Sequence, residues 1–145
     1  KRVVIARIPM ERSSIQHAFA MTREYAIIFD PPWYVEPSLV DIVFTNIHFQ
    51  EMIKNDINGT TKIHAVRLSD GKITTFDAKR WSMILHFGNA YQTDEDTIVV
   101  EGPAYEKPDS NPFKIFLHDN IQDAAGLTGH NHGSLFKRYI LNFKD

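Results

Sequence analysis

The chain has 145 residues, a net charge of −2, 43% hydrophobic residues and no cysteine. This length fits one domain, and the hydrophobic content excludes a disordered chain. The scattered Lys and Arg residues argue against nucleic acid as a partner, and any metal site must use imidazole, carboxylate or backbone oxygen ligands.

β-strand patterns dominate the chain. The apolar segment 3–8 predicts a first strand, closed by Pro9, and Asp70-Gly71 predicts a two-residue turn inside a later hairpin. Short strands separated by turn signals favour a sandwich, a barrel or a propeller. The predicted strands are 3–8, 17–22, 25–30, 62–68, 72–76, 86–91, 97–101, 112–117 and 137–143.

Residues 31–60 interrupt this pattern. Pro31 to Tyr34 is predicted to be an apolar loop, and Ser38 can cap a helix that apolar spacing predicts over 39–54. Residues 119–134 are polar and rich in glycine, which indicates a surface loop. No apolar run is long enough to span a membrane. Residue 1 is Lys, so we expect a processed chain or part of a longer one.

Two histidines begin the same local pattern. Ile15-Gln16-His17 and Ile84-Leu85-His86 each open a strand that is followed by a polar turn, a β-branched strand ending in an acid, and a proline break. Such a repeat suggests repeated β units. A symmetric fold would bring both histidines to one point, as in a metal site. The alternative is that both are hydrogen-bonded core residues.

The other histidines are interpreted as structural. His48 lies in the predicted helix, His64 in a hairpin strand and His118 at a strand end. The spacing of His130-Asn131-His132 would allow metal chelation from an extended chain, but the neighbouring glycines favour a solvated loop.

The two histidine segments resemble motifs of the carotenoid cleavage oxygenase family. Residues 14–29 are similar to its His-x-Phe-x-x-Thr motif with the following Tyr and apolar strand, and residues 85–91 look like its Phe-His-x-x-Asn-x-Tyr-Glu motif. Residues 63–68 and 137–143 resemble two further strands of the family in the same order. Leu85 and Gln92 depart from the second motif, which usually has Phe and Glu there.

The resemblance implies an all-β fold: about three blades of a seven-bladed β-propeller, with a short helical or loop insertion near 31–60, over the single segment 1–145. It also implies a non-haem Fe(II) held by four histidines, of which His17 and His86 match two. The family uses O2 to cleave carotenoids or related alkenes. In the insertion, the side chains expected along an apolar substrate path are Trp33, Tyr34, Leu39 and Phe44.

Two hypotheses of function follow. In the first, the chain is a fragment of a carotenoid-type dioxygenase. Its partners are the carotenoid or apocarotenoid substrate, O2, the rest of the propeller or a larger complex, and a peripheral membrane surface. In the second, it is a non-catalytic structural subunit that retains the blades. The other two ligand motifs lie outside these 145 residues, so we expect the isolated chain to be inactive. Localisation stays open among intracellular, plastid and membrane-associated, with intracellular favoured.

Overall fold

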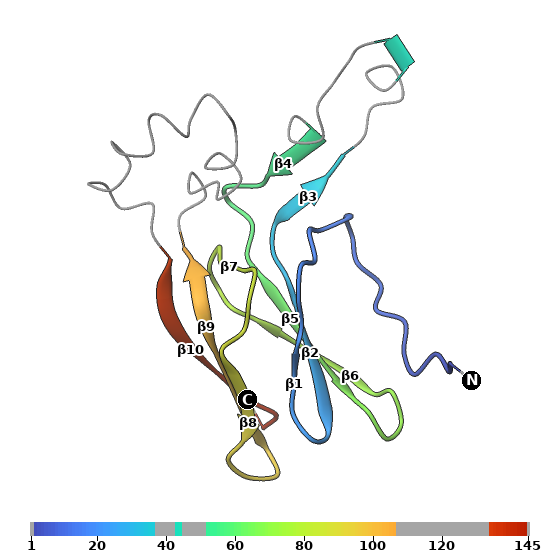
Figure 1. Cartoon of the computed structure of the whole chain (residues 1–145), viewed down its shortest axis with the longest axis vertical. Coiled ribbons are helices and arrows are strands. Elements are labelled where there is room, and N and C mark those ends of the chain that lie inside the picture. The colour runs from blue at the N-terminus through green and yellow to red at the C-terminus, as the bar shows by residue number, and fades with distance from the viewer. Residues whose placement is uncertain (1, 37–42, 45–51, 107–133, 145) are drawn as a thin grey trace.

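The computed structural model of the chain describes residues 2–36, 43–44, 52–106 and 134–144, which are mainly strands and connecting loops (Figure 1). These strands form two four-stranded antiparallel sheets and one two-stranded hairpin. The tips of the hairpins β1/β2, β5/β6 and β8/β9 lie at one end of the molecule, and β3/β4 lies toward the other (Figure 1). The strands are β1 (Ala20–Met21), β2 (Tyr25–Asp30), β3 (Trp33–Val35), β4 (Ile53–Asn55), β5 (Lys62–Arg67), β6 (Ile73–Asp77), β7 (Met83–Ile84), β8 (Asn89–Gln92), β9 (Thr97–Tyr105) and β10 (Leu135–Asn142).

The first sheet has the strand order β1-β2-β5-β6 with antiparallel neighbours throughout. Along β2, Tyr25, Ile27 and Phe29 are buried while the residues between them are partly exposed, because successive side chains of a strand point to opposite faces. The predicted pairings of 17–22 with 25–30 and of 62–68 with 72–76 are confirmed, although β1 is shorter than predicted.

The second sheet is built around β9. The edge strand β10 pairs with one side of β9 along its whole length, and β7 and β8 pair with different parts of the other side. Ile98, Val99 and Val100 are buried in this central strand. The predicted pairing of 86–91 with 97–101 is therefore confirmed from Asn89 onward, whereas residues 86–88 form no strand. The predicted strand 137–143 is confirmed as part of β10.

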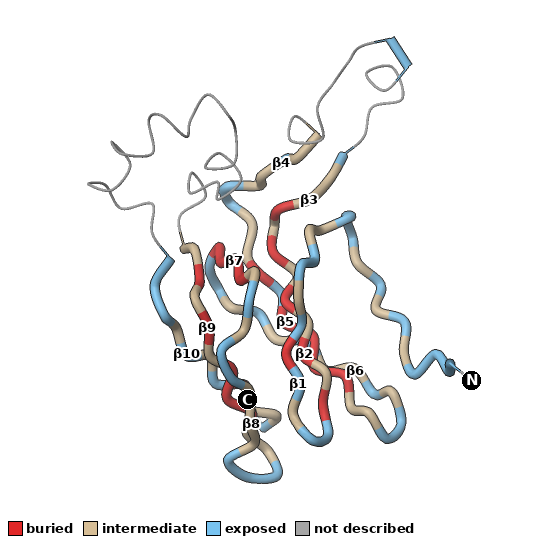
Figure 2. Tube along the Cα trace, viewed as in Figure 1, coloured by how far each residue is buried: buried red, intermediate tan, exposed pale blue. Residues whose placement is uncertain are grey.

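The two sheets pack through one apolar cluster, and buried residues follow β2, β5 and β9 where the sheets meet (Figure 2). Aromatic contacts cross the junction, with the rings of Phe29 and Tyr139 5.1 Å apart and those of Tyr25 and Phe143 also 5.1 Å apart. A fully buried side chain such as Ile27 contributes about 1.5–3 kcal/mol to folding. This packing holds the two sheets as one body.

The segment 3–8 forms no strand, which corrects the first prediction. Its apolar side chains instead line a groove with Phe19, Ile28 and Val66 on the second face of the first sheet. The backbone passes so close to the β5/β6 loop that a Cβ built on Gly71 would lie 2.2 Å from the Ile5 carbonyl oxygen. Val3, Val4 and Ile5 stay 78%, 65% and 53% exposed, so the apolar pattern of this segment does not indicate a buried strand.

The loop between β5 and β6 is longer than the predicted two residues. Arg67 and Lys72 close it, because the amide of Arg67 donates to the carbonyl of Lys72 and the amide of Gly71 donates to the carbonyl of Arg67. Gly71 has a φ of 73°, whereas Asp70 is not among the residues with positive φ. A two-residue type I′ turn needs positive φ at both positions, so the chain forms a four-residue loop, 68–71, instead.

The insertion near 31–60 contains the hairpin β3/β4, with Trp33 opposite Asn55. The predicted apolar loop 31–34 is therefore wrong at its end, and the predicted helix 39–54 is wrong at residues 53–54, which belong to β4. Cross-strand pairing outweighs the helical spacing there. Residues 43–44 have helical backbone, and the rest of the predicted helix lies outside the described residues.

Several other predictions also fall outside the described residues. They are the strand 112–117, nearly all of the loop 119–134, and the histidines His48, His118, His130 and His132. In the part of the chain that the structure describes, no helix has the length and apolarity needed to cross a membrane.

Candidate metal centre

Each of the two marked histidines interrupts the inner strand of its unit. Before His17, Ser14 forms a bridge with Tyr34 of β3, and after His17 β1 pairs with β2. Before His86, β7 pairs with the C-terminal end of β9. After His86, β8 pairs with the N-terminal half of β9. Both histidines precede the next strand by three residues (20 − 17 and 89 − 86). The sequence repeat is thus also a structural repeat.

The interruption at His86 is a bulge in the second sheet. Ile84 pairs with Ala104 and Asn89 with Glu101, so residues 85–88 lie opposite only residues 102–103. A bulge of this kind turns a side chain out of the regular alternation. Gly102 permits it, because a Cβ at this position would lie 2.8 Å from the carbonyl oxygen of His86.

In the first unit a side chain substitutes for the ladder beside His17. The amide nitrogen of the Gln16 side chain donates to the carbonyl of Phe29 at 2.8 Å and to the hydroxyl of Ser14 at 2.9 Å. The carbonyl of Phe29 in β2 thereby has a hydrogen-bond partner at a place where the backbone around His17 no longer pairs with β2. Gln16 therefore holds the interrupted segment against β2.

A second apolar cluster anchors both interrupted segments. Trp33, Trp81 and Met83 are buried in this anchor cluster, and Ile15 and Leu85 pack against them. Ile15 lies two residues before His17, and Leu85 lies directly before His86. The cluster thus draws the two histidine segments to one place although they are 69 positions apart (86 − 17).

The two imidazoles meet there. The ring centroids of His17 and His86 lie 4.8 Å apart, and the ring planes are nearly perpendicular at 87°. Both residues are exposed. The expectation that the repeat brings them to one point is confirmed, whereas their role as metal ligands stays a prediction.

This geometry fits a shared divalent metal ion. Imidazole nitrogens bind such ions at about 2.0–2.1 Å, so two imidazoles at neighbouring positions on one ion have centroids roughly 4.5 Å apart. Among the described residues, no group of three or more His, Asp or Glu side chains is placed to hold a metal. The described residues thus bring two imidazoles together, and a metal ion between them stays a prediction.

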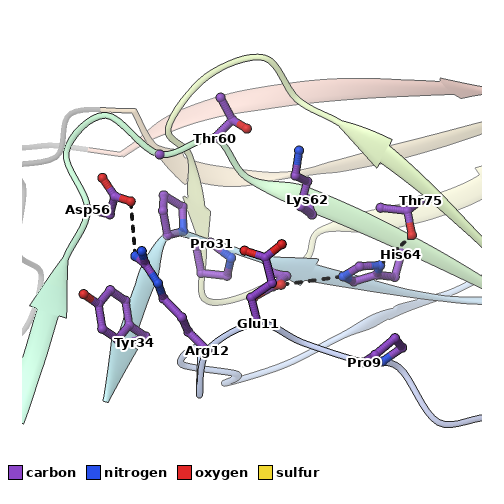
Figure 3. Close-up of a pocket in the computed structure, with 13 residues that line it drawn as sticks. Pro9, Glu11, Arg12, Pro31, Tyr34, Asp56, Thr60, Lys62, His64 and Thr75 are labelled. Carbon is purple, nitrogen blue, oxygen red and sulfur yellow. Dashed lines mark hydrogen bonds and ion pairs between the residues drawn. The ribbon is translucent and has the colours of Figure 1, made fainter. Parts of the chain in front are cut away.

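His64 lies in a different environment. It is buried, its Nδ1 is 2.9 Å from the hydroxyl of Thr75, and its Nε2 lies 3.7 Å from a carboxylate oxygen of Asp30. All three side chains line a pocket of about 390 Å³. Figure 3 shows His64 and Thr75 there, with the ion pair of Arg12 and Asp56 on another part of the lining. Neither His17 nor His86 lines this pocket. The structural interpretation of His64 agrees with its burial in a paired strand.

The predicted substrate-path residues do not share one environment. Trp33 is 3% exposed in the anchor cluster, whereas Phe44 is 80% exposed. The ring of Tyr34 stacks under the guanidinium of Arg12 at 4.6 Å. Leu39 lies outside the described residues. Trp33 packs in the anchor cluster, and a substrate path along these four side chains stays a prediction.

Sequence reasoning missed the residues that position the imidazoles. Gln16, Trp81 and Gly102 act on residues at least 13 positions away, and Trp81 donates from its indole nitrogen to Asn55 at 2.8 Å. One signal was available for Gly102, because the acid-glycine-proline break ends the repeat that begins at Ile84. Nothing in the local sequence signals the roles of Gln16 and Trp81.

Comparison with known proteins agrees with this arrangement. The family model described as retinal pigment epithelial membrane protein matches residues 2–145. No curated protein matches significantly. Solved structures similar to the chain include a variant of Synechocystis apocarotenoid oxygenase (ACO), with 19% identity, a TM-score of 0.53 and coverage of 62% of this chain and 18% of that chain.

Two further structures give similar values. A cobalt-substituted Synechocystis ACO has 20% identity and a trigonal crystal form of an ACO/RPE65 chimera has 21%, and both have a TM-score of 0.54 and coverage of 63% of this chain and 18% of theirs. At these identities the structures support the fold alone, a partial β-propeller. The aligned part spans less than a fifth of the solved chains. Through the family match, this chain belongs to the retinal pigment epithelial membrane protein family, the carotenoid cleavage oxygenases that its histidine motifs resemble.

Proposed function

We propose that this chain is part of a non-haem Fe(II) dioxygenase that cleaves carotenoids or related apolar alkenes, with His17 and His86 as two of the iron ligands. The observation that carries the proposal is the 4.8 Å separation of the two imidazoles, which originate from equivalent positions of two repeated units. The family match over residues 2–145 supports the same activity class, and one similar structure is a cobalt-substituted ACO.

The chain's own residues would provide binding and orientation. His17 and His86 would each donate one imidazole nitrogen, held in place by the bulge at 85–88 and by Gln16. Neutral imidazoles leave a divalent ion its full charge, and bound iron would supply the redox chemistry between O2 and the alkene. In the insertion, the buried Trp33, the half-buried Tyr34, the exposed Phe44 and Leu39 would contribute to an apolar approach for the substrate.

A metal titration tests the proposal on this chain. We expect Co(II) to bind, and His17→Ala or His86→Ala to weaken binding by more than about tenfold, since even loss of a single outer partner of a ligand costs about 10–100-fold. Both residues are exposed, so the variants should fold. Because His130 and His132 have chelating spacing, the same titration is run with both replaced by alanine. Binding that depends on this pair and not on His17 would refute the proposal.

The alternative is a non-catalytic structural subunit that retains the blades. Iron content and the mass of the native polypeptide separate the two functions. A longer native chain with bound iron and carotenoid cleavage lost in His86→Ala supports the dioxygenase, whereas an iron-free native protein supports the subunit.

A further inference from the structure

Gln92 links the two histidine-bearing units through side chains. Strands β1 and β8 lie against each other but belong to different sheets, and no backbone ladder joins them in the described residues. Gln92 ends β8, and its side-chain oxygen accepts a hydrogen bond from the hydroxyl of Thr22 at 3.2 Å. Its amide nitrogen donates to a carboxylate oxygen of Glu24 at 3.2 Å. We call these three side chains the clamp.

The Thr22 side of the clamp is itself fixed. Its hydroxyl oxygen accepts hydrogen bonds from the amides of Glu24 at 3.2 Å and Tyr25 at 3.0 Å, in the turn that joins β1 to β2. The hydroxyl proton is then left to donate to Gln92. The side-chain amide of Gln92 is thus held in one orientation, in which its oxygen accepts from Thr22 and its nitrogen donates to Glu24. A carboxylate at residue 92 would instead face the carboxylate of Glu24.

The clamp lies at the C-terminal ends of β1 and β8, and each imidazole lies three residues before the start of one of these strands. His17 precedes Thr22 by five residues and His86 precedes Gln92 by six (22 − 17 and 92 − 86). At about 3.3 Å per residue the clamp and the imidazoles are at most ~20 Å apart, so a rotation of about 3° at the clamp moves an imidazole by ~1 Å. Metal–ligand distances hold within about 0.2 Å.

The geometry points to Gln92 as a positioning residue that sets the relative angle of β1 and β8 and, through it, the placement of His17 against His86. Ala20 and Ala90 of these strands also belong to the shared core, but apolar packing is non-directional. Hydrogen bonds to Thr22 and Glu24 add the direction that packing of small side chains lacks. This inference rests on the proposed metal role of the histidines.

A charge-swap series tests the clamp. In Q92E the two carboxylates repel, and we expect Co(II) affinity to fall about tenfold, the lower end of the cost of losing ligand orientation. In Q92E/E24Q the amide and carboxylate have changed places, and affinity should return to within about twofold of the unmodified chain. The control Q92E/E95Q has the same net charge but leaves Glu24 in place, and it should stay weak.

A second readout separates this inference from the proposed function. In the metal-free chain, proton cross-relaxation between the rings of His17 and His86 should be strong, be reduced in Q92E and return in Q92E/E24Q. If Co(II) does not bind to the unmodified chain, the proposed function fails and the ring contact alone decides the role of Gln92. An unchanged ring contact in Q92E, or equal rescue by E95Q, would overturn the inference.

Discussion

Gly102 lies against the backbone of His86, so closely that a Cβ at residue 102 would be 2.8 Å from the carbonyl oxygen of His86 and 3.3 Å from the Cα of Phe87. Both contacts are to backbone, which cannot rotate away as a side chain can. The bulge that turns His86 out of the ladder thus requires a glycine on the partner strand.

Gly102→Ala should therefore destabilise the fold and displace His86. We expect a loss of about 1–3 kcal/mol, the usual cost of overpacking, together with weaker Co(II) binding. Urea unfolding and metal titration measure the two effects. Gly88→Ala is the matched control in the same bulge, because its Cβ would meet the ring of Phe136 at 3.2 Å, and that exposed ring can move. Equal losses in both variants would contradict the role of Gly102.

Trp81→Ala should separate the two imidazoles by weakening the anchor cluster. The indole is buried, and its nitrogen donates to Asn55. Truncation of a buried tryptophan costs about 3–5 kcal/mol. We expect the cross-relaxation between the rings of His17 and His86 to be lost while the β2/β5 pairing persists in hydrogen exchange.

Phe76→Ala serves as the comparison for Trp81→Ala, because Phe76 packs on the other core cluster. It should lower stability yet keep the imidazole contact. Loss of the contact in both variants would indicate that it depends on overall stability and not on the anchor cluster.

Gly71→Ala should release the N-terminal segment. Gly71 combines a φ of 73° with the close approach of the Ile5 carbonyl, so alanine is both strained and in collision. We expect faster proteolysis within residues 2–8. In a chain that begins at Pro9 the collision is absent, and the same substitution should cost only about 1 kcal/mol for the left-handed backbone. If Gly71→Ala lowers the free energy of unfolding by a similarly large amount in both chains, the contact with Ile5 contributes nothing to that loss.

The Arg67–Asp70 pair should add a small acid-sensitive contribution to stability. The side-chain hydrogen bonds from Arg67, followed by the amide of Lys72, lower the pKa of Asp70 from 3.8 to about 2. A lowered carboxyl pKa stabilises the folded state above the unfolded pKa, and this contribution is lost as the pH falls from about 4 to 2.

Asp70→Asn should remove the pH dependence attributable to this pair between about pH 4 and 2, with a small effect at neutral pH because the pair is exposed. An NMR titration of the Asp70 carboxyl carbon gives the pKa directly. A midpoint near 3.8 in the unmodified chain, or a midpoint that does not rise in Arg67→Gln, would contradict the assignment.

The sequence alone determined three hairpin pairings and the equivalence of His17 and His86. Alternation along Tyr25–Asp30 and the β-branched run of Thr97–Val100 are local signals, because one face of each strand must be buried. Where local signals were weak or mixed, as in the predicted helix 39–54 and the segment 3–8, prediction failed at the residues the structure describes. Ile53 packs against the cluster of Trp33 and Trp81, and the spacing of apolar residues does not reveal such distant partners.

Only the tertiary structure decided how the imidazoles meet. Their approach depends on a cluster that joins Ile15, Trp33, Trp81 and Leu85, and on the close packing of Gly102 against His86. The clamp of Gln92 with Thr22 and Glu24 joins residues about 70 positions apart. A repeat in the sequence indicates which residues are equivalent, because equivalent residues hold the same position in the order of each unit. Their distance and angle follow from packing between sheets, which depends on contacts between segments far apart in sequence.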